Sequence, residues 1–533
     1  MSEALDVLVI GAGFSGCYQL YRLREKGFNV RLYDAGAALG GVWHWNCYPG
    51  ARVDSHVPNY EFSIEEVWRD WRWTERFPGC QELRAYFEYV DQRLDLSKDV
   101  RFNSRIVRAE FNDAERFWLL ECEDGHRVRV RYVLSCLGFA SNAYLPDISG
   151  LDSFKGHCYH TARWPQEGLS FSDSKVGVIG TGASGVQIIQ EASKVAASVT
   201  VFQRTPMIAL PMQQQSYTAE QYEEWKQEFP EIFRRRDASG GGLYDINPDR
   251  RAAWEVPEEE RRQRFEAAWQ EGGFQFWSGT YSDILSHLDS NRLAYDFWRD
   301  KTRARLDDPS LHEKLAPTEP LHPFGAKRPS LEQGYYECFN QSNVELVELK
   351  QTPIQEVTPN GVRLHERDID LDVLVLATGF DGSSGGLTQI DLKGVDGSNI
   401  AEAWGQGVRT WLGIGVPNFP NMLMLYGPQS PSAFWNGPTS AEVQGDWIIE
   451  LLCWLRSKGM TRIEANREAA ESWNLHMDEL ASSTLLPLAD SWYMGANIPG
   501  KPRQLLHHSG AQSYLGFCSE CRKNNYFGFD ISQ

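Results

Sequence analysis

Two glycine-rich loops constrain the fold of this chain more than any other feature of its sequence. The loop Gly11–Gly16 follows the apolar run Val7–Ile10, and the loop Gly180–Gly185 follows the run Lys175–Ile179. Both have the spacing Gly-x-Gly-x-x-Gly, which turns a strand sharply into a helix and directs the first backbone N–H groups of that helix towards a pyrophosphate. One such loop is a weak signal, but two copies in strand–turn–helix context predict two dinucleotide-binding units.

The residues that end the second strand of each unit predict different ligands. In the first unit the strand Val30–Tyr33 ends at Asp34, eighteen positions after Gly16. A carboxylate there accepts hydrogen bonds from the hydroxyls of an adenosine ribose. In the second unit Gln203 takes the equivalent place, and Arg204 follows it. Loss of the carboxylate and gain of a cation favour a ribose 2′-phosphate, so we expect FAD in the first site and NADPH in the second.

Length, charge and cysteine usage narrow the class of protein. The 533 residues suggest two or three domains, and a net charge of −19 argues against a nucleic-acid partner. The 10 cysteines are scattered, as in a reduced cytoplasmic protein, and Cys518-x-x-Cys521 is the single CxxC pair, so we expect no metal site. No apolar run approaches the roughly 20 residues that span a bilayer. The first strand begins too early to leave room for a signal peptide, and we expect no membrane association.

The order of the predicted elements indicates an α/β fold with two Rossmann-like dinucleotide-binding domains and a mainly helical insertion in the second. In the insertion, aromatic residues from Tyr222 to Phe233 share one helix face, and we expect Pro230 to break that helix. The buried strand Val373–Leu376 then closes the second domain, and the chain returns to the first. The expected boundaries are 1–142 and 386–533 for the FAD-binding domain, 151–215 and 321–380 for the NADPH-binding domain, 216–320 for the insertion, and 143–150 and 381–385 for the linkers.

Other elements of the first domain are predicted from composition and alternation. Residues 58–95 are rich in aromatic residues and are expected to be helical. Three short strands are expected at Arg101–Val107, Phe117–Glu123 and Val128–Val133. Near the C-terminus, Trp447–Leu455 is predicted to form a helix.

Two longer motifs connect the chain to a known family. Residues 154–165, FKGHCYHTARWP, fit the pattern FxGxxxHxxxW(P/D), and residues 40–54 fit (A/G)GxWxxxx(F/Y)P(G/M)xxxD. The sequence therefore resembles the Baeyer–Villiger monooxygenases, which are class B flavoprotein monooxygenases, and is similar to the cyclohexanone and phenylacetone monooxygenases among them. The likeness continues in residues 334–340, 377–381 and 491–501, so it covers nearly the whole chain.

The resemblance implies FAD- and NADPH-dependent oxidation of a ketone to an ester or lactone with O2, through a C4a-peroxyflavin. The flavin carries this chemistry, and the protein supplies position and charge. An anionic peroxide requires a fixed cation in a dry site. The catalytic arginine of the family matches Arg328, and Asp54 matches the acid that orients it. The implied partner is a small ketone, with a sulfide as the other candidate substrate, and the implied assembly is a monomer or weak homo-oligomer.

The resemblance also implies which residues contact the cofactors. Arg204 and Lys327 match contacts to the 2′-phosphate, and Trp492 matches an aromatic residue of a mobile loop over the nicotinamide nucleotide. Thr181 to Gln187 match the pyrophosphate loop. The full set of expected cofactor contacts is Gly11, Gly13, Ser15, Gly16, Asp34, Gly41, Trp43, Arg52, Asp54, Tyr60, Ile106, Thr181, Gly182, Ala183, Ser184, Gly185, Gln187, Arg204, Thr205, Lys327, Arg328, Gly437 and Trp492.

Several of these residues have a plainer interpretation. Arg328 could be a surface cation in a basic loop, Asp54 a solvated turn acid, and Trp43 a residue that only packs against the flavin. His160 is a candidate general base because histidine titrates near neutrality. Its place beside a domain linker favours a structural or domain-coupling role instead.

Three other functions stay open on the sequence alone. A flavin monooxygenase that oxidises amines or sulfides uses the same two nucleotide folds. A disulfide or quinone reductase requires a redox dithiol near the flavin, and Cys17 and Cys47 form no close pair in the sequence. A non-catalytic NADPH-binding sensor is the third alternative, and the complete set of oxygenation motifs argues against it.

Overall fold

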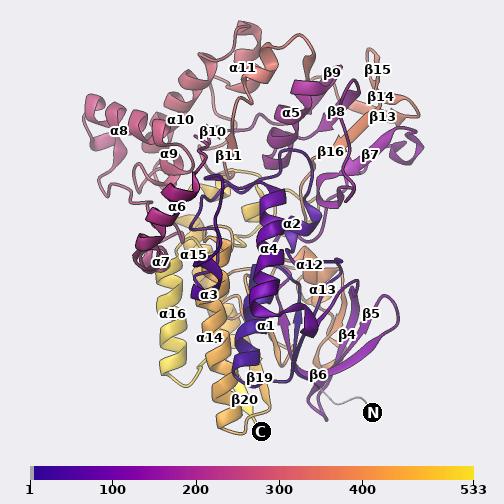
Figure 1. The fold of residues 1–533 in the computed structure, drawn as a ribbon, viewed down its shortest axis with the longest axis vertical. Helices are drawn as coiled ribbons and strands as arrows, with labels where there is room; N and C mark the ends of the chain where they lie inside the picture. The colour runs from indigo at the N-terminus through magenta and orange to yellow at the C-terminus, as the bar shows by residue number, and fades with distance from the viewer. Residues whose placement is uncertain (1–4) are drawn as a thin grey trace.

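The chain folds around two β-sheets. One strand of each sheet leads into one of the two glycine-rich loops. In this computed structural model, which describes residues 5–533, the first sheet lies in the lower part of Figure 1 and the second in the upper part. Among the residues described, no helix combines the length and the apolar character that crossing a membrane would require.

The first sheet has eight strands. Their bounds are β1 (Leu5–Ile10), β2 (Val30–Tyr33), β3 (Val100–Arg101), β4 (Ile106–Asn112), β5 (Phe117–Cys122), β6 (Arg127–Ser135), β17 (Asp391–Lys393) and β18 (Met422–Met424). Their order is β17-β4-β5-β6-β1-β2-β3, with β18 paired to β6. Strand β1 pairs in parallel with β2 and β6, and helix α1 (Phe14–Glu25) follows the first glycine-rich loop. Cys17, Leu20 and Leu23 of α1 are buried, as their helical spacing predicts.

The second sheet has five strands in the order β12-β9-β8-β16-β7, all paired in parallel. Their bounds are β7 (His157–His160), β8 (Lys175–Ile179), β9 (Ser198–Gln203), β12 (Val344–Glu348) and β16 (Val373–Leu376). Helix α5 (Ala183–Val195) follows the second glycine-rich loop. Strand β7 comes from the motif at residues 154–165, so that motif forms the edge of this sheet next to β16.

Smaller sheets and further helices complete the fold. The remaining strands are β10 (Ala209–Pro211) with β11 (Ser330–Glu332), β13 (Ile354–Thr358) with β14 (Gly361–Leu364) and β15 (Asp368–Asp370), and β19 (Arg462–Ala465) with β20 (Phe529–Ser532). The C-terminal part contributes α12 (Gly385–Thr388), α13 (Ile400–Ala403), α14 (Gly437–Ser457), α15 (Arg467–Ser482) and α16 (Ala511–Lys523). Helix α14 packs along α1, so the end of the chain covers the first sheet.

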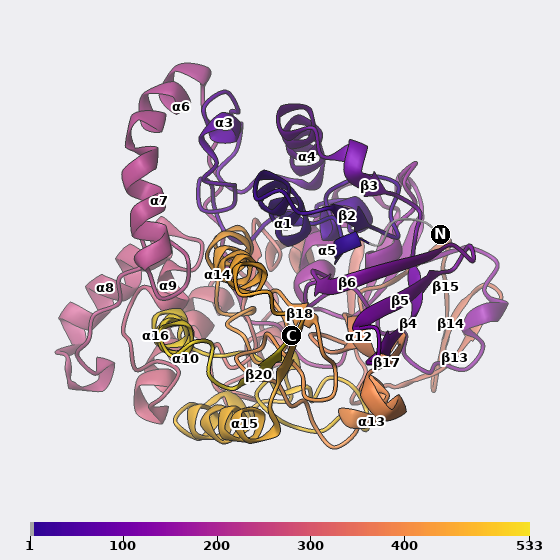
Figure 2. The ribbon, with the colours of Figure 1, turned by 90° about the horizontal axis from the view of Figure 1, so that it is seen from below.

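Residues 216–320 contain six helices: α6 (Ala219–Trp225), α7 (Phe229–Ala238), α8 (Glu258–Glu271), α9 (Gln275–Ser278), α10 (Leu288–Arg303) and α11 (His312–Leu315). Figure 2 shows α6, α7 and α8 on the side of the molecule away from β4 and β5. The predicted helix is interrupted before Pro230, because a short 3-10 turn at Lys226–Glu228 separates α6 from α7. Pro230 sits in the first turn of α7, where its missing N–H costs no helical hydrogen bond.

Helix α7 is joined to the first sheet's helices by a buried ion pair. Arg236 Nη2 donates to Glu442 Oε2 of α14 at 2.5 Å, and Arg236 Nη1 donates to the backbone oxygen of Glu61 at 2.9 Å. Burial raises the pKa of the Glu61 carboxyl to about 8, although nearby groups that include Arg236 oppose the shift. Helix α7 therefore packs against a helix of the first sheet. Helices α10 and α11 contact the second unit instead, because Trp298 Nε1 donates to the oxygen of Ala209 at 3.0 Å and Gln203 Nε2 donates to the oxygen of Lys314 at 2.8 Å.

Three predictions of local structure are wrong in extent. Residues 58–95 form only α3 (Glu65–Trp68) and α4 (Cys80–Leu94), with turns between them. Their aromatic residues, such as Trp73 and Phe77, lie in those turns and are buried. The high aromatic content therefore indicated burial in the core and not a helix. The strand expected at Arg101–Val107 is divided between β3 and β4. Helix α14 extends well beyond the predicted Trp447–Leu455, which is only its most apolar part.

Candidate active site

A cavity of about 1810 Å³ meets both glycine-rich loops. The ends of strands from both sheets contribute to its wall, including Ile10 of β1, Tyr33 of β2, Ile179 of β8 and Phe202 of β9. The carboxyl ends of parallel strands form one edge of a sheet, and ligands of α/β proteins bind at that edge. The cavity therefore lies where two dinucleotides are expected.

The cavity brings together nearly all of the residues predicted to form the site. Its wall includes Gly11, Gly13, Ser15, Asp34, Gly41, Trp43, Arg52, Asp54, Tyr60, Ile106, Thr181, Gly182, Ala183, Ser184, Gln187, Arg204, Thr205, Lys327, Arg328, Gly437 and Trp492. Gly16 and Gly185 are not part of the wall. A Cβ on Gly16 would lie 1.8 Å from the oxygen of Gly11, and a Cβ on Gly185 would lie 2.2 Å from the oxygen of Gly180. These two glycines let each helix approach its loop closely, as the third glycine of the motif requires.

Asp34 is held rigidly at the end of β2. The N–H of Ala12 donates to Oδ2 at 2.6 Å, and the N–H of Gly36 donates to Oδ1 at 2.5 Å. Burial raises the pKa of the Asp34 carboxyl, while these two backbone donors oppose that shift. The contact with Ala12 places the carboxylate beside the first glycine-rich loop, as a ribose-binding acid requires.

Helices α1 and α5 both begin at the cavity with uncapped N-termini. Gly13 and Gly182 are the N-cap residues, and no side chain caps either helix. A Cβ built on Gly182 would meet no atom within 4 Å, so the backbone there is open to a ligand. Free N–H groups and the positive end of the helix dipole suit phosphate groups. Both loops therefore fit the pyrophosphate of a dinucleotide.

Arg328 is fixed by one carboxylate and one carbonyl from distant parts of the chain. Its Nε donates to Asp54 Oδ2 at 2.8 Å, and its Nη1 donates to the backbone oxygen of Ala433 at 3.0 Å. Burial opposes the charge on the guanidinium, but Asp54 together with Tyr493 and Tyr426 raises the pKa of Arg328. Arg328 therefore stays a cation, and neither it nor Asp54 is a free surface charge.

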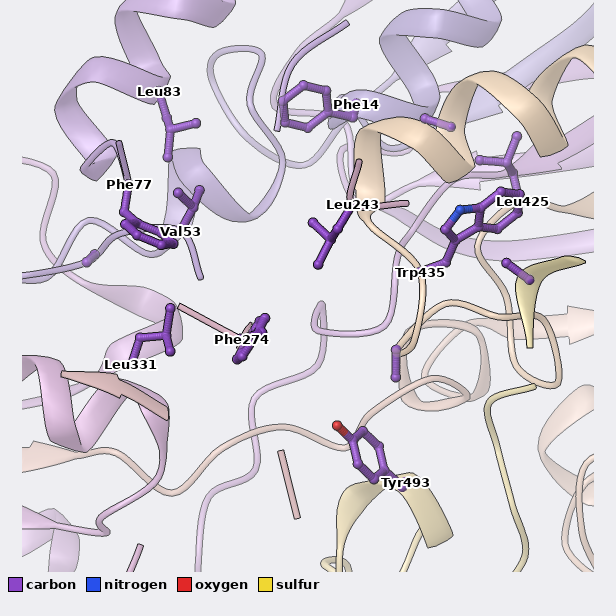
Figure 3. Close-up of a cluster of buried hydrophobic side chains, with 14 of the residues drawn as sticks. Phe14, Val53, Phe77, Leu83, Leu243, Phe274, Leu331, Leu425, Trp435 and Tyr493 are labelled. Carbon is purple, nitrogen blue, oxygen red and sulfur yellow. The ribbon is translucent and has the colours of Figure 1, made fainter. Parts of the chain in front are cut away.

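Apolar and aromatic side chains surround this cation. The Arg328 guanidinium carbon lies 4.6 Å from the ring centroid of Phe274 and 5.8 Å from that of Trp277. Figure 3 shows Phe274, Leu243 and Tyr493 reaching the same region from different segments of the chain. Apolar neighbours lower the local polarity around the guanidinium, which strengthens the field of a fixed charge.

Two further cations lie in the same cavity wall: Arg204 directly after β9, and Lys327 shortly before β11. Arg204 and Lys327 both line the cavity, and burial together with the nearby Arg204 lowers the pKa of the Lys327 ammonium. The Thr181 hydroxyl donates to the backbone oxygen of Thr205 at 2.8 Å, which joins the second glycine-rich loop to the segment after β9. Two neighbouring cations beside the end of β9 suit a 2′-phosphate.

A family profile over the N-terminal part of the chain and relatives over its full length indicate the same kind of enzyme. A profile of the flavin-binding monooxygenase-like family matches residues 4–219. The chain is 46% identical over 533 residues to cyclopentanone 1,2-monooxygenase of Comamonas sp. (strain NCIMB 9872), which covers 100% of this chain and 97% of that protein. It is 38% identical to acetone monooxygenase (methyl acetate-forming) of Gordonia sp. (strain TY-5), with 100% of both covered. The chain belongs to the Baeyer–Villiger monooxygenase family.

Solved structures match this monooxygenase over its whole length. The structure of OTEMO in complex with FAD and NADP has a TM-score of 0.96 and 36% sequence identity, with 100% of both chains covered. Cyclohexanone monooxygenase from Rhodococcus sp. Phi1 bound to NADP⁺ gives the same TM-score of 0.96 and the same 36% identity, again with 100% of both chains covered. The predictions of the family, of a flavin monooxygenase and of mixed α/β sheets of the Rossmann type are confirmed.

The motif at residues 40–54 of this Baeyer–Villiger monooxygenase contacts both dinucleotide units. The Tyr48 hydroxyl donates to Gln187 Oε1 at 2.8 Å and lies 3.2 Å from the Ser184 hydroxyl, both in α5. Gln187 Nε2 donates in turn to the backbone oxygen of Arg52 at 3.1 Å. The Arg52 side chain pairs with Glu75 at 2.8 Å, so it is not a free surface charge. The sequence showed the motif but not that its Tyr48 reaches the second unit.

Trp492 stacks on an aromatic residue that the sequence analysis missed. Its ring lies 5.1 Å from the ring of Phe139, with 9° between the planes. The same segment is tied to residues 380–382, because Asn497 Nδ2 donates to the oxygen of Phe380 at 2.8 Å and Lys501 Nζ donates to Asp381 Oδ1 at 2.5 Å. Phe139 follows the small-residue turn after β6, and that position is the one signal that could have indicated it.

His160 stands outside the cavity wall. Its Nδ1 accepts a hydrogen bond from the N–H of Ala162 at 3.0 Å, and its ring lies 6.1 Å from that of Phe380. Burial, aided by Arg163, lowers the pKa of His160 to about 4. The imidazole is therefore neutral near pH 7 and packs beside the segment after β16. This placement favours a structural role over a general base.

Proposed function

We propose that this monooxygenase inserts one oxygen atom of O2 beside the carbonyl carbon of a small ketone and forms an ester or a lactone. Its relatives are named for cyclopentanone and acetone, which are small cyclic and linear ketones. The prediction of FAD and NADPH as cofactors is confirmed by the matching structures that hold FAD and NADP. A sulfide stays a second candidate substrate, because an oxygen atom can equally be transferred to sulfur.

The residues of the first unit fit FAD, and those of the second fit NADPH. In the first, Asp34 would accept the ribose hydroxyls, and the start of α1 would receive the pyrophosphate. In the second, the open backbone at Gly182 would receive the pyrophosphate, and Arg204 with Lys327 would bind the 2′-phosphate. When bound and reduced, the flavin supplies the activation of O2.

Arg328 is the residue that makes the cavity suited to oxygenation. Negative charge develops on the carbonyl oxygen of a ketone when a nucleophilic oxygen adds to it, and a fixed cation in an apolar site stabilises that charge. Asp54 and the carbonyl of Ala433 hold the guanidinium in one orientation. The single observation that carries the proposal is this oriented cation in the same cavity as both glycine-rich loops.

We also propose the domain boundaries that the sequence predicts. Residues 1–142 and 386–533 would form the FAD-binding domain, and 151–215 with 321–380 the NADPH-binding domain. The return of the chain to β17 and β18 of the first sheet supports this division. The contact of α7 with α14 and the contact of α11 with β9 support an insertion that packs against both domains.

The test is product analysis with the purified, FAD-loaded protein. We expect consumption of NADPH and O2 on addition of cyclopentanone or acetone, with one lactone or ester formed per NADPH. Aryl ketones and a methyl aryl sulfide complete the panel. Sulfoxide from the sulfide without ester from any ketone would refute ketone oxidation and favour the sulfide-oxidising alternative.

A further inference from the structure

His507 is a buried histidine that lies just outside the cavity wall and bridges two segments of the chain. Its side chain has no solvent exposure. Its Nε2 lies 3.1 Å from the hydroxyl of Ser383, and its Nδ1 lies 2.7 Å from the hydroxyl of Ser432. Ser383 belongs to the segment between β16 and α12, and Ser432 belongs to the segment between β18 and α14.

Ser432, one of the two partners of His507, directly precedes a residue that contacts Arg328. Ser432 lines the cavity, and the next residue, Ala433, supplies the carbonyl that accepts the hydrogen bond from Arg328 Nη1 at 3.0 Å. The direction of that carbonyl therefore depends on the backbone at Ser432. The hydrogen bond between His507 Nδ1 and the Ser432 hydroxyl restrains this backbone next to the cation.

The backbone on both sides of His507 fixes the position of the ring. The N–H of Gln429 donates to the oxygen of Leu506 at 2.7 Å, and the N–H of His508 donates to the oxygen of Ser430 at 2.9 Å. The N–H of Leu506 donates to the oxygen of Tyr493 at 2.9 Å. Residues 506–508 are thus held to the segment before Ser432 and to the segment that carries Trp492.

Aromatic rings and cations complete the surroundings of the imidazole. Trp492 lies 4.9 Å from the His507 ring at 81° between planes, and Tyr493 lies 5.9 Å away at 74°. Burial lowers the pKa of His507 to about 3, and Lys501 and Arg328 add to the shift. A neutral imidazole has one donor and one acceptor nitrogen, and two hydroxyls can complement both.

We propose that His507 is a positioning residue for Arg328: it joins Ser383 to Ser432 and so holds the Ala433 carbonyl on which the guanidinium rests. This inference rests on the proposed function, because it assigns His507 to the oxygenation step that Arg328 serves. The group acts through Ala433 and touches no reacting atom. Its loss should leave NADPH binding in place and allow more of the O2 consumed to appear as hydrogen peroxide.

The test uses two substitutions that separate the two hydrogen bonds. The amide of His507→Asn can take the place of Nδ1 and keep the bond to Ser432, whereas the amide of His507→Gln can take the place of Nε2 and keep only the bond to Ser383. We expect the ratio of ester to peroxide per NADPH to fall about fivefold in His507→Gln, the change that loss of one neutral hydrogen bond gives. His507→Asn should retain most of the wild-type ratio, and the KM for NADPH should change in neither variant.

His508→Asn is the matched control. His508 is also fully buried, with its ring stacked 5.4 Å from Trp473, but its Nε2 lies 3.0 Å from that of His476 and not beside Ser383 or Ser432. We expect this variant to keep the wild-type ratio. An equal fall in His508→Asn and His507→Gln would show a general packing effect and overturn the proposal.

A measurement without turnover accompanies the product ratio. If His507 and Ser432 act through one bond, the unfolding midpoints of Ser432→Ala, His507→Gln and the double variant should be non-additive, and Ser432→Ala should reproduce the fall in ratio. Additive changes in the unfolding midpoint would refute the role of His507. So would a wild-type ratio of ester to peroxide in both Ser432→Ala and His507→Gln, provided that the wild-type protein forms ester. Absence of ester from the wild-type protein would instead refute the proposed function.

Discussion

Removing the guanidinium of Arg328 tests the chemistry of the site most directly. Arg328→Ala takes away a cation that donates to Asp54 at 2.8 Å and to the oxygen of Ala433 at 3.0 Å. Asp54 is left without its partner, but its side chain is 37% exposed, so water can solvate the carboxylate. We therefore expect the variant to fold and to bind FAD, since the residues of the first glycine-rich loop are unchanged.

The expected loss lies in product formation. Loss of one donor that stabilises a developing oxyanion costs about 10²–10³-fold in rate, or roughly 3–4 kcal/mol. We expect ester formation to fall by at least this factor, while NADPH oxidation falls less and the O2 consumed appears as hydrogen peroxide. Arg328→Lys should recover little, because one ammonium on a flexible stem cannot reproduce two donors held in a planar fork.

The assay measures ester and hydrogen peroxide per NADPH consumed for wild type, Arg328→Ala and Arg328→Lys, with the FAD content of each checked by absorbance. Near-wild-type ester per NADPH in Arg328→Ala would refute the catalytic assignment. Equal recovery by lysine would show that charge alone suffices and that the orientation set by Asp54 and Ala433 is unimportant.

Three further predictions concern the coenzyme, the glycine-rich loops and the buried Glu61. Arg204→Ala should weaken NADPH binding by roughly 1.5–3 kcal/mol and leave KM for NADH unchanged; equal losses with both coenzymes in steady-state assays would contradict a phosphate contact. Gly182→Ala should keep the wild-type unfolding midpoint and weaken NADPH binding, because its Cβ meets nothing within 4 Å, whereas Gly16→Ala should lower the midpoint, because its Cβ would lie 1.8 Å from a backbone oxygen. Burial raises the pKa of Glu61 from 4.5 to about 8, so the folded state binds the proton more tightly and stability should fall as pH rises through that window. Chemical denaturation should show that the free energy of unfolding of Glu61→Gln depends less on pH, by up to roughly 1.4 kcal/mol per unit of pKa shift. An unchanged pH dependence would show that Glu61 titrates normally.

The sequence alone determined the features that depend on short, contiguous stretches. Each glycine-rich loop acts within one strand–turn–helix unit, so its spacing predicts both the backbone turn and the uncapped helix that follows. Asp34 and Arg204 directly follow the second strands of their units, and the crossover between the two parallel strands of such a unit is almost always right-handed. These local rules predicted the two nucleotide sites, and the motifs at residues 40–54 and 154–165 predicted the family.

Only the tertiary structure decided how distant segments meet at the site. Asp54 and Arg328 are 274 positions apart, and the Ala433 carbonyl comes from a third segment. No local propensity encodes such contacts, because they exist only when the two sheets and the C-terminal segments pack together. The same reason explains why α7 lies against α14 through Arg236 and Glu442, although the sequence places α7 inside the second unit. Residues 58–79 are mostly turns and not the expected helix, because their aromatic side chains reach the core from those turns. Tertiary packing commonly outweighs helix propensity in this way.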